Sequence, residues 1–72
     1  MATTIHNEVR RLRRDRDWTQ AHLGGLVGVS RQTLIAIERG GTPSLATAFA
    51  LARHLGTDIA TMFPNHDIQP SE

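Results

Sequence analysis

Apolar side chains recur at helical spacing along most of the chain, with polar positions between them. The clearest case begins after Ser44. The i, i+3, i+4 pattern of a buried helix face is formed there by Leu45, Ala48, Phe49, Ala52 and Leu55. Ser44 is a suitable N-cap for this helix, and Gly56 is a suitable residue to end it. The pattern therefore predicts an amphipathic helix over residues 45–55.

Helices are also predicted at the two ends of the chain. Asn7 is a suitable N-cap for a first helix that carries Val9 and Leu12 three residues apart. Asp58 is a suitable cap for a short last helix, which has an apolar side made of Ile59, Met62 and Phe63. So short a helix needs packing to be stable, so we expect Ile59 and Met62 to form a dimer interface. Phe63 either joins them there or packs on Phe49 or Leu55 in the core, and the sequence leaves both alternatives open.

The stretch from Gln20 to Arg39 predicts two short helices that cross steeply around a turn. Their inward apolar positions are Leu23, Val27, Val29, Leu34 and Ile37. Gly28 lies between the helices, where the residue after a helix end commonly takes a positive φ. Thr19 and Ser30 stand at the two N-cap positions. This spacing is typical of a helix-turn-helix.

The same stretch resembles the signature of the Cro and phage-repressor (XRE-like) helix-turn-helix family, T-Q-x-x-L-A-x-x-x-G-V-S-x-x-T-I-x-x-I/W-E-x-G. The matching residues, with Leu34 in place of the isoleucine, are Thr19, Gln20, Leu23, Gly28, Val29, Ser30, Thr33, Ile37, Glu38 and Gly40. The resemblance covers roughly residues 7–63. It implies an all-α, compact, five-helix lambda-repressor-like fold. It also implies a sequence-specific double-stranded DNA-binding transcriptional regulator, a repressor that acts as a homodimer.

The second helix of the motif would carry the DNA-facing side chains. Leu34 and Ile37 point inward, which leaves as candidates Ser30, Arg31, Gln32, Thr33, Ala36 and Arg39. Arg31 and Gln32 have the donor and acceptor groups to read guanine and adenine edges, and Gln20 is expected to hold a phosphate. Ile35 departs from the polar residue usual in the family. It could meet a thymine methyl, stay a scattered surface residue or, as we favour, pack on a neighbouring helix.

Arg13 and Glu38 are predicted to form a structural ion pair. Arg13 follows Val9 by four residues and so lies on the inward stripe of the first helix, whereas Arg10, Arg11, Arg14 and Arg16 look like a solvated face. A buried guanidinium needs a carboxylate, and Glu38 follows the inward Leu34 by four residues. The family resemblance implies the same pair. The alternative is two independent surface charges.

Composition bounds the class of protein. Seventy-two residues make one domain, which we place at 1–63, followed by a flexible tail at 64–72. The chain has no cysteine, no apolar run of eighteen residues and no hydrophobic N-terminal segment, so we expect an intracellular, cytoplasmic protein without membrane association. Residues 1–40 carry a net charge of +3 and residues 41–72 a net charge of −2. The basic half contains the helix-turn-helix.

Residue patterns for other chemistry are absent from the sequence. The four histidines include no pair three or four apart, and the glycines do not form a G-x-G-x-x-G loop. We therefore expect no metal, no cofactor and no enzymatic activity. The alternative in another class is a protein-interaction module, such as the antitoxin of a toxin-antitoxin pair. A regulatory protein partner is compatible with either interpretation.

Overall fold

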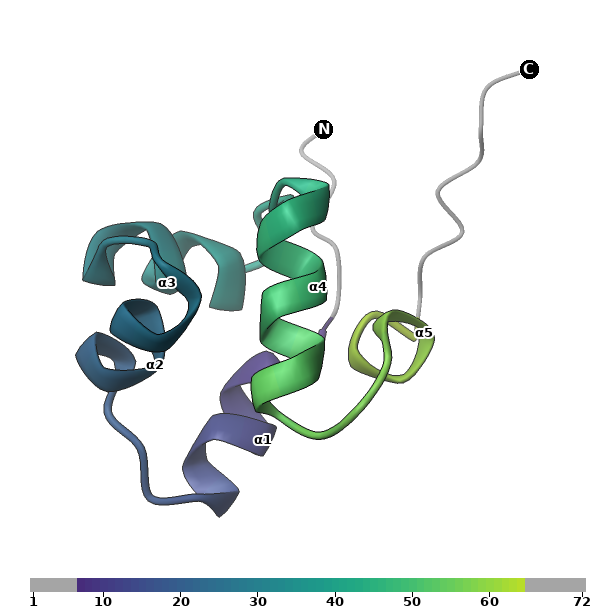
Figure 1. Cartoon of the computed structure of the whole chain (residues 1–72), viewed down its shortest axis with the longest axis horizontal. Helices are drawn as coiled ribbons and strands as arrows, with labels where there is room; N and C mark the ends of the chain where they lie inside the picture. Colours follow the sequence, from purple (N-terminus) through teal and green to yellow (C-terminus); the bar gives the residue numbers. More distant parts are fainter. Residues whose placement is uncertain (1–6, 65–72) are drawn as a thin grey trace.

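A computed structural model describes residues 7–64, which form five α-helices and contain no strand (Figure 1). The helices run Val9–Asp15 (α1), Gln20–Val27 (α2), Arg31–Glu38 (α3), Leu45–His54 (α4) and Ile59–Met62 (α5). The all-α, five-helix expectation is thus confirmed, whereas the predicted tail falls almost wholly outside the described residues. None of these helices is long and apolar enough to cross a membrane.

Side-chain caps begin four of the helices at the residues that the sequence indicates. The Thr19 and Ser30 hydroxyls each accept a hydrogen bond of 3.0 Å from the backbone amide three residues on. Ser44 and Asp58 cap α4 and α5 in the same way, at 3.1 and 2.7 Å. Each cap satisfies an amide that has no partner inside its helix.

Asn7 fixes the start of α1 with both ends of its amide group. Its Oδ1 accepts a hydrogen bond of 3.0 Å from the Val9 amide. Its Nδ2 donates to the Ile37 carbonyl at 2.8 Å. The residue therefore joins the beginning of α1 to the last turn of α3, although its place is one position before the N-cap of α1, which is Glu8.

The turn between α2 and α3 depends on two glycines. Gly28 ends α2 with φ of 80°, a left-handed conformation that costs glycine little. Gly24 is buried where the helices meet, and a Cβ built there would lie 2.9 Å from the Val29 carbonyl oxygen. The structure therefore leaves room for less than an alanine at this contact.

The core lies between the helices, with α4 packed against α2 on one side and against α5 on the other (Figure 1). Its buried members are Val9, Leu23, Leu34, Ile37, Ala48, Leu51, Ala52, Leu55, Met62 and Phe63. The sequence prediction for α4 was wrong in part, since Leu45 and Phe49 are 68% and 58% exposed. The buried side of α4 contains Leu51 instead, next to Ala48 and Ala52. The apolar pattern did not identify this side, because α4 carries apolar residues on more than one side.

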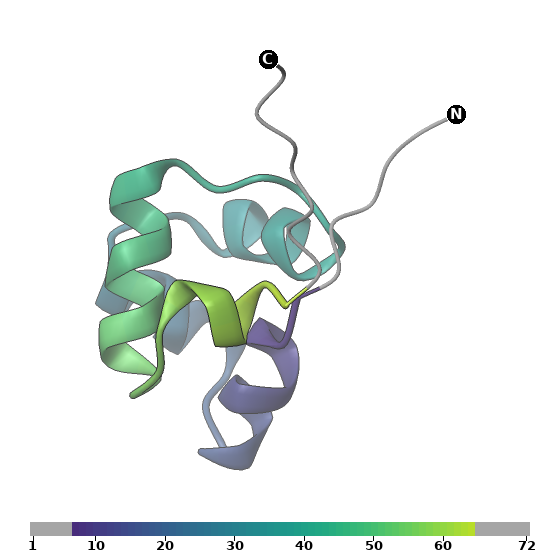
Figure 2. The ribbon, with the colours of Figure 1, turned by 90° about the vertical axis from the view of Figure 1, so that its right-hand side faces the viewer.

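The prediction for α5 also needs correction. Met62 is fully buried and Phe63 is 5% exposed within the single chain, so neither offers a surface to a second subunit. Ile59 is half-buried and remains partly accessible. Figure 2 shows α5 between the base of α4 and the start of α1, where the Glu8 amide donates to the Met62 carbonyl at 2.8 Å. That position turns Met62 inward.

Candidate nucleic-acid interface

The exposed side of α3 carries the residues that the sequence assigns to DNA. Leu34 and Ile37 are buried, while exposed positions are held by Ser30, Arg31, Gln32, Thr33, Ala36 and Arg39. The Ser30 hydroxyl donates to Thr33 Oγ1 at 2.9 Å and accepts from the Thr33 amide, so both hydroxyls are engaged in the cap. The long side chains left for external contacts are Arg31, Gln32 and Arg39.

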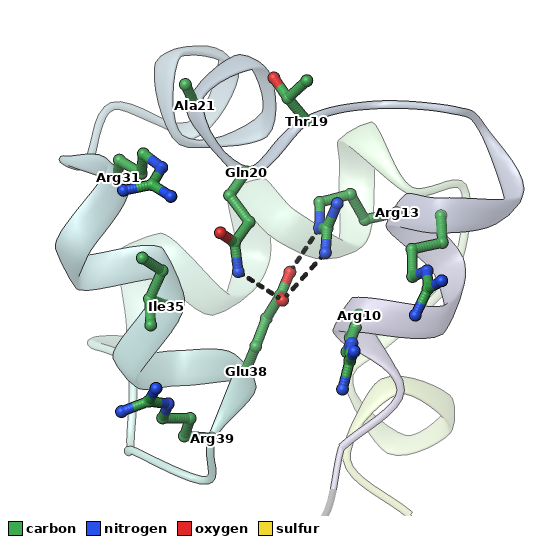
Figure 3. A pocket seen from close by; sticks show the side chains of 10 residues that line it. Arg10, Arg13, Thr19, Gln20, Ala21, Arg31, Ile35, Glu38 and Arg39 are labelled. Carbon is green, nitrogen blue, oxygen red and sulfur yellow. Dashed lines mark hydrogen bonds and ion pairs between the residues drawn. The ribbon is translucent and has the colours of Figure 1, made fainter.

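A cavity of about 790 Å³ lies beside α3, bounded by α1 and the first turn of α2 (Figure 3). Its lining residues are Arg10, Arg13, Arg14, Thr19, Gln20, Ala21, Arg31, Ile35, Glu38 and Arg39. The fold thus brings three of the predicted DNA-binding residues, Gln20, Arg31 and Arg39, to one site. The remaining four, Ser30, Gln32, Thr33 and Ala36, lie on other exposed parts of α3.

The Glu38 carboxylate lies between the two sides of this cavity and joins three helices (Figure 3). Arg13 Nε lies 2.7 Å from Oε2, and Arg13 Nη2 lies 3.2 Å from Oε1. Gln20 Nε2 donates to Oε1 at 3.2 Å. The Arg13 and Glu38 side chains are only 11% and 4% exposed, and the third guanidinium nitrogen donates to the Trp18 carbonyl at 2.8 Å.

This network determines what Gln20 can offer to a ligand. One amide hydrogen of Gln20 is committed to Glu38, which leaves the second hydrogen and the carbonyl oxygen. All three guanidinium nitrogens of Arg13 donate a hydrogen bond, two of them to Glu38 and one to the Trp18 carbonyl. Arg13 and Glu38 therefore orient the site, and Gln20 stands at its edge with donor capacity remaining.

The cavity also contains residues outside the predicted DNA-binding set, among them Arg10, Arg14 and Ile35. Arg10 and Arg14 are exposed and line the cavity from α1. Their spacing of four residues, with Arg13 beside them, could have placed them on the side of α1 that faces Glu38. Ile35 is half-buried and also lines the cavity, outside the set of residues that pack on the core. Ile35 therefore does not belong to the core, and its packing on a neighbouring helix stays a prediction.

Two further arginines, Arg11 and Arg16, have hydrogen-bond partners within the protein. Arg11 contacts Glu8 at 2.8 Å and Asp15 at 3.4 Å on the surface of α1, and the hydrogen bond to Glu8 raises the pKa of Arg11 above its ordinary value. Arg16 donates to the Leu55 carbonyl at 2.8 Å. Between residues 7 and 64, no group of three or more metal-ligating side chains comes together.

Comparison with known proteins agrees with this architecture. A family model described as Helix-turn-helix matches residues 9–62. A protein of Methanocaldococcus jannaschii is 42% identical over 88% of this chain and 97% of its own length. One of Methanothermobacter thermautotrophicus is 45% identical over 69% and 74%. YgzD of Bacillus subtilis is 38% identical over 82% and 91%. All three are named uncharacterized HTH-type transcriptional regulators. The chain thus belongs to the helix-turn-helix family of the Cro and phage-repressor type.

Proposed function

We propose that this protein is a sequence-specific double-stranded DNA-binding transcriptional regulator, a repressor without enzymatic activity that acts as a homodimer. The observation that carries the proposal is the exposed α3 beside a cavity lined by five arginines and one glutamate, a net charge of +4. Such a basic surface next to a helix that fits the major groove matches the charge and shape of duplex DNA. The names of the relatives support the same function.

In this proposal α3 lies in the major groove with its N-terminal residues against the bases. Arg31 and Gln32 are exposed at that end and present planar groups suited to guanine and adenine edges. Gln20 and the first turn of α2 hold a backbone phosphate, to which amide hydrogens and the helix dipole are favourable. Ile35, half-buried at the cavity, is placed to contact a thymine methyl group.

Selection of duplexes from a random library tests sequence specificity directly. Arg31→Ala and Gln32→Ala are each expected to cost about 1 to 3 kcal/mol in binding and to relax preference at one base position. Gln20→Ala is expected to weaken all duplexes by a similar factor, because a phosphate contact carries no sequence information. Recovery of no preferred duplex would contradict the function. Identical profiles for the two kinds of variant would contradict only the assignment of roles.

Salt dependence provides a second measurement. A dimer that makes about six to ten phosphate contacts is expected to lose about three to five orders of magnitude in affinity between roughly 50 and 200 mM salt. Fluorescence anisotropy with a labelled duplex measures this change over a salt series. An affinity that does not change with salt would show that arginine and phosphate contacts do not hold the complex together.

The dimer we propose uses the outer side of α4 and the start of α5. Phe49 is 58% exposed there, beside the half-buried Ile59, and the two line an open groove of about 640 Å³ together with Arg53 and Asp58. Arg53 has no ion-pair partner among residues 7–64. Two copies related by a two-fold axis would each present the same two opposite charges at this groove, which favours pairing of Arg53 in one protomer with Asp58 in the other.

Sedimentation at micromolar concentration tests this interface. Phe49→Glu is expected to give folded monomers that bind DNA weakly, since a charge at the centre of an apolar contact opposes association. Leu45→Glu, on the same helix but outside the groove lining, is the matched control and should leave the dimer intact. A wild-type protein that sediments as a monomer both free and on DNA would exclude the dimer.

A further inference from the structure

We propose that α1 is a second phosphate-binding element, in which Arg10 and Arg14 contact the DNA backbone across the cavity from α3. This inference rests on the proposed function, since it names further residues of the same DNA-binding surface. It assigns a role to two side chains that otherwise belong to an ordinary solvated helix face. The ligand groups are the phosphates of the strand that borders the occupied major groove.

The arginines fall into two groups, those with a side-chain hydrogen bond to another residue and those without one. Of the eight arginines in the chain, Arg11, Arg13 and Arg16 have side-chain hydrogen bonds to other residues. The other five have no such partner within residues 7–64, and these are Arg10, Arg14, Arg31, Arg39 and Arg53. Four of the five line the cavity, and Arg53 lies at the groove on α4. The unpaired arginines are therefore concentrated at one site.

Four guanidinium groups around one cavity have an electrostatic cost. Guanidinium groups around one depression repel one another, and the repulsion is stronger beside a low-dielectric interior than in bulk water. Glu38 is the one acidic residue in the lining, and its 4% exposed carboxylate is already bonded to Arg13 and Gln20. An external anion with several charges would remove this repulsion, and a duplex backbone carries such charges in series.

The arrangement of the helices allows the backbone of one DNA strand to contact residues on both sides of the cavity. In Figure 3, Arg31 and Arg39 lie on the α3 side of the cavity and Arg10 lies on the α1 side, with Gln20 between them. When α3 occupies the major groove, the backbone at the edge of the groove passes over the α2 N-terminus, where Gln20 binds it. Arg10 and Arg14 then meet the phosphates next to the one held by Gln20.

The slope of log affinity against log salt concentration tests this role. The probes are a duplex recovered by selection and a random-sequence duplex of about 20 base pairs, two helical turns. Each lost phosphate contact is expected to make the slope less steep by about 0.9. Arg10→Ala or Arg14→Ala removes one contact from each protomer of a dimer, so it should make the slope less steep by about 1.8, equally for both duplexes. Arg10→Lys keeps the charge and should retain most of the slope.

Arg11→Ala is the matched control, because it removes the same charge from the same helix at a residue already paired with Glu8 and Asp15. Its slope is expected to stay at the wild-type value. Equal reductions for Arg10, Arg11 and Arg14 would show an effect of net charge alone and would overturn the inference. Unchanged slopes for folded Arg10 and Arg14 variants would overturn it as well, while the proposed function stands if the wild type still selects a duplex.

Discussion

Replacement of Arg13 by alanine is expected to cause a large loss of stability, because it breaks a buried ion pair. The change removes two hydrogen bonds to Glu38 and one to the Trp18 carbonyl. The Glu38 side chain is only 4% exposed and would keep a single partner, Gln20. Loss of one partner of a buried pair costs about 3 to 5 kcal/mol, because a charge is left without compensation away from water.

That cost is large relative to the whole domain. At about 0.05 to 0.15 kcal/mol per residue, a chain of 72 residues has a free energy of unfolding of about 4 to 11 kcal/mol. In a domain of this size, each kcal/mol shifts Tm by about 4 to 8 °C, so Arg13→Ala is expected to lower Tm by about 12 to 40 °C. Arg14→Ala, at an exposed position of the same helix, should stay within about 0.5 kcal/mol of the wild type.

Thermal unfolding followed by circular dichroism measures both variants under the same conditions. A double variant, Arg13→Met with Glu38→Leu, is expected to recover part of the loss because no buried charge remains uncompensated. Equal melting temperatures for Arg13→Ala and Arg14→Ala would refute the reasoning, since they would mean that the pair contributes no more than a surface contact.

Three further predictions concern the packing and the caps. Gly25→Ala should stabilise the domain by about 0.5 to 1 kcal/mol, because a Cβ there meets nothing within 4 Å. Gly24→Ala should destabilise it, because a Cβ there would lie too close to the Val29 carbonyl oxygen. The Tm values of the two variants should therefore move in opposite directions. Met62→Glu should unfold the chain, as judged by loss of helical ellipticity, since the side chain is fully buried. The hydrogen bond from the Thr61 amide lowers the pKa of Asp58 below its ordinary value of 3.8. The cap therefore stabilises the protein above that pH, and this stabilisation is lost as the pH falls through the lowered pKa. Asp58→Ala should reduce this acid dependence in melting curves recorded over a pH series.

Local signals in the sequence were sufficient for much of the fold. The caps at Thr19, Ser30 and Ser44 and the left-handed Gly28 depend on interactions within a few residues, so the sequence predicts them and the structure confirms them. Local interactions alone do not determine which side of α4 faces the core. The segment LATAFALARH is apolar on several sides, and the positions of the other helices decide that Leu51 is buried while Phe49 is exposed.

The same distinction applies to the site. The sequence predicts the exposed positions of Arg31 and Gln32 on α3, because the family signature fixes their place in the helix. The spacing of Arg10 and Arg14 places them on the side of α1 that faces Glu38, but what this side can bind depends on the cavity that α2 and α3 close around Glu38. For α5, four residues contain about one helical turn, which is too little periodicity to show that Met62 points inward.

The hydrogen bond between the Glu8 amide and the Met62 carbonyl links the first helix of the domain to the last. Asn7, the neighbour of Glu8, is bonded in turn to Ile37 in α3. A helix as short as α5 has little stability of its own, so its local opening should require the entry to α1 to open as well. Native-state hydrogen exchange would then report one cooperative unit rather than two fraying ends. The amides of α5 would exchange at rates close to those at the start of α1, and both would slow together when DNA holds α3 in place.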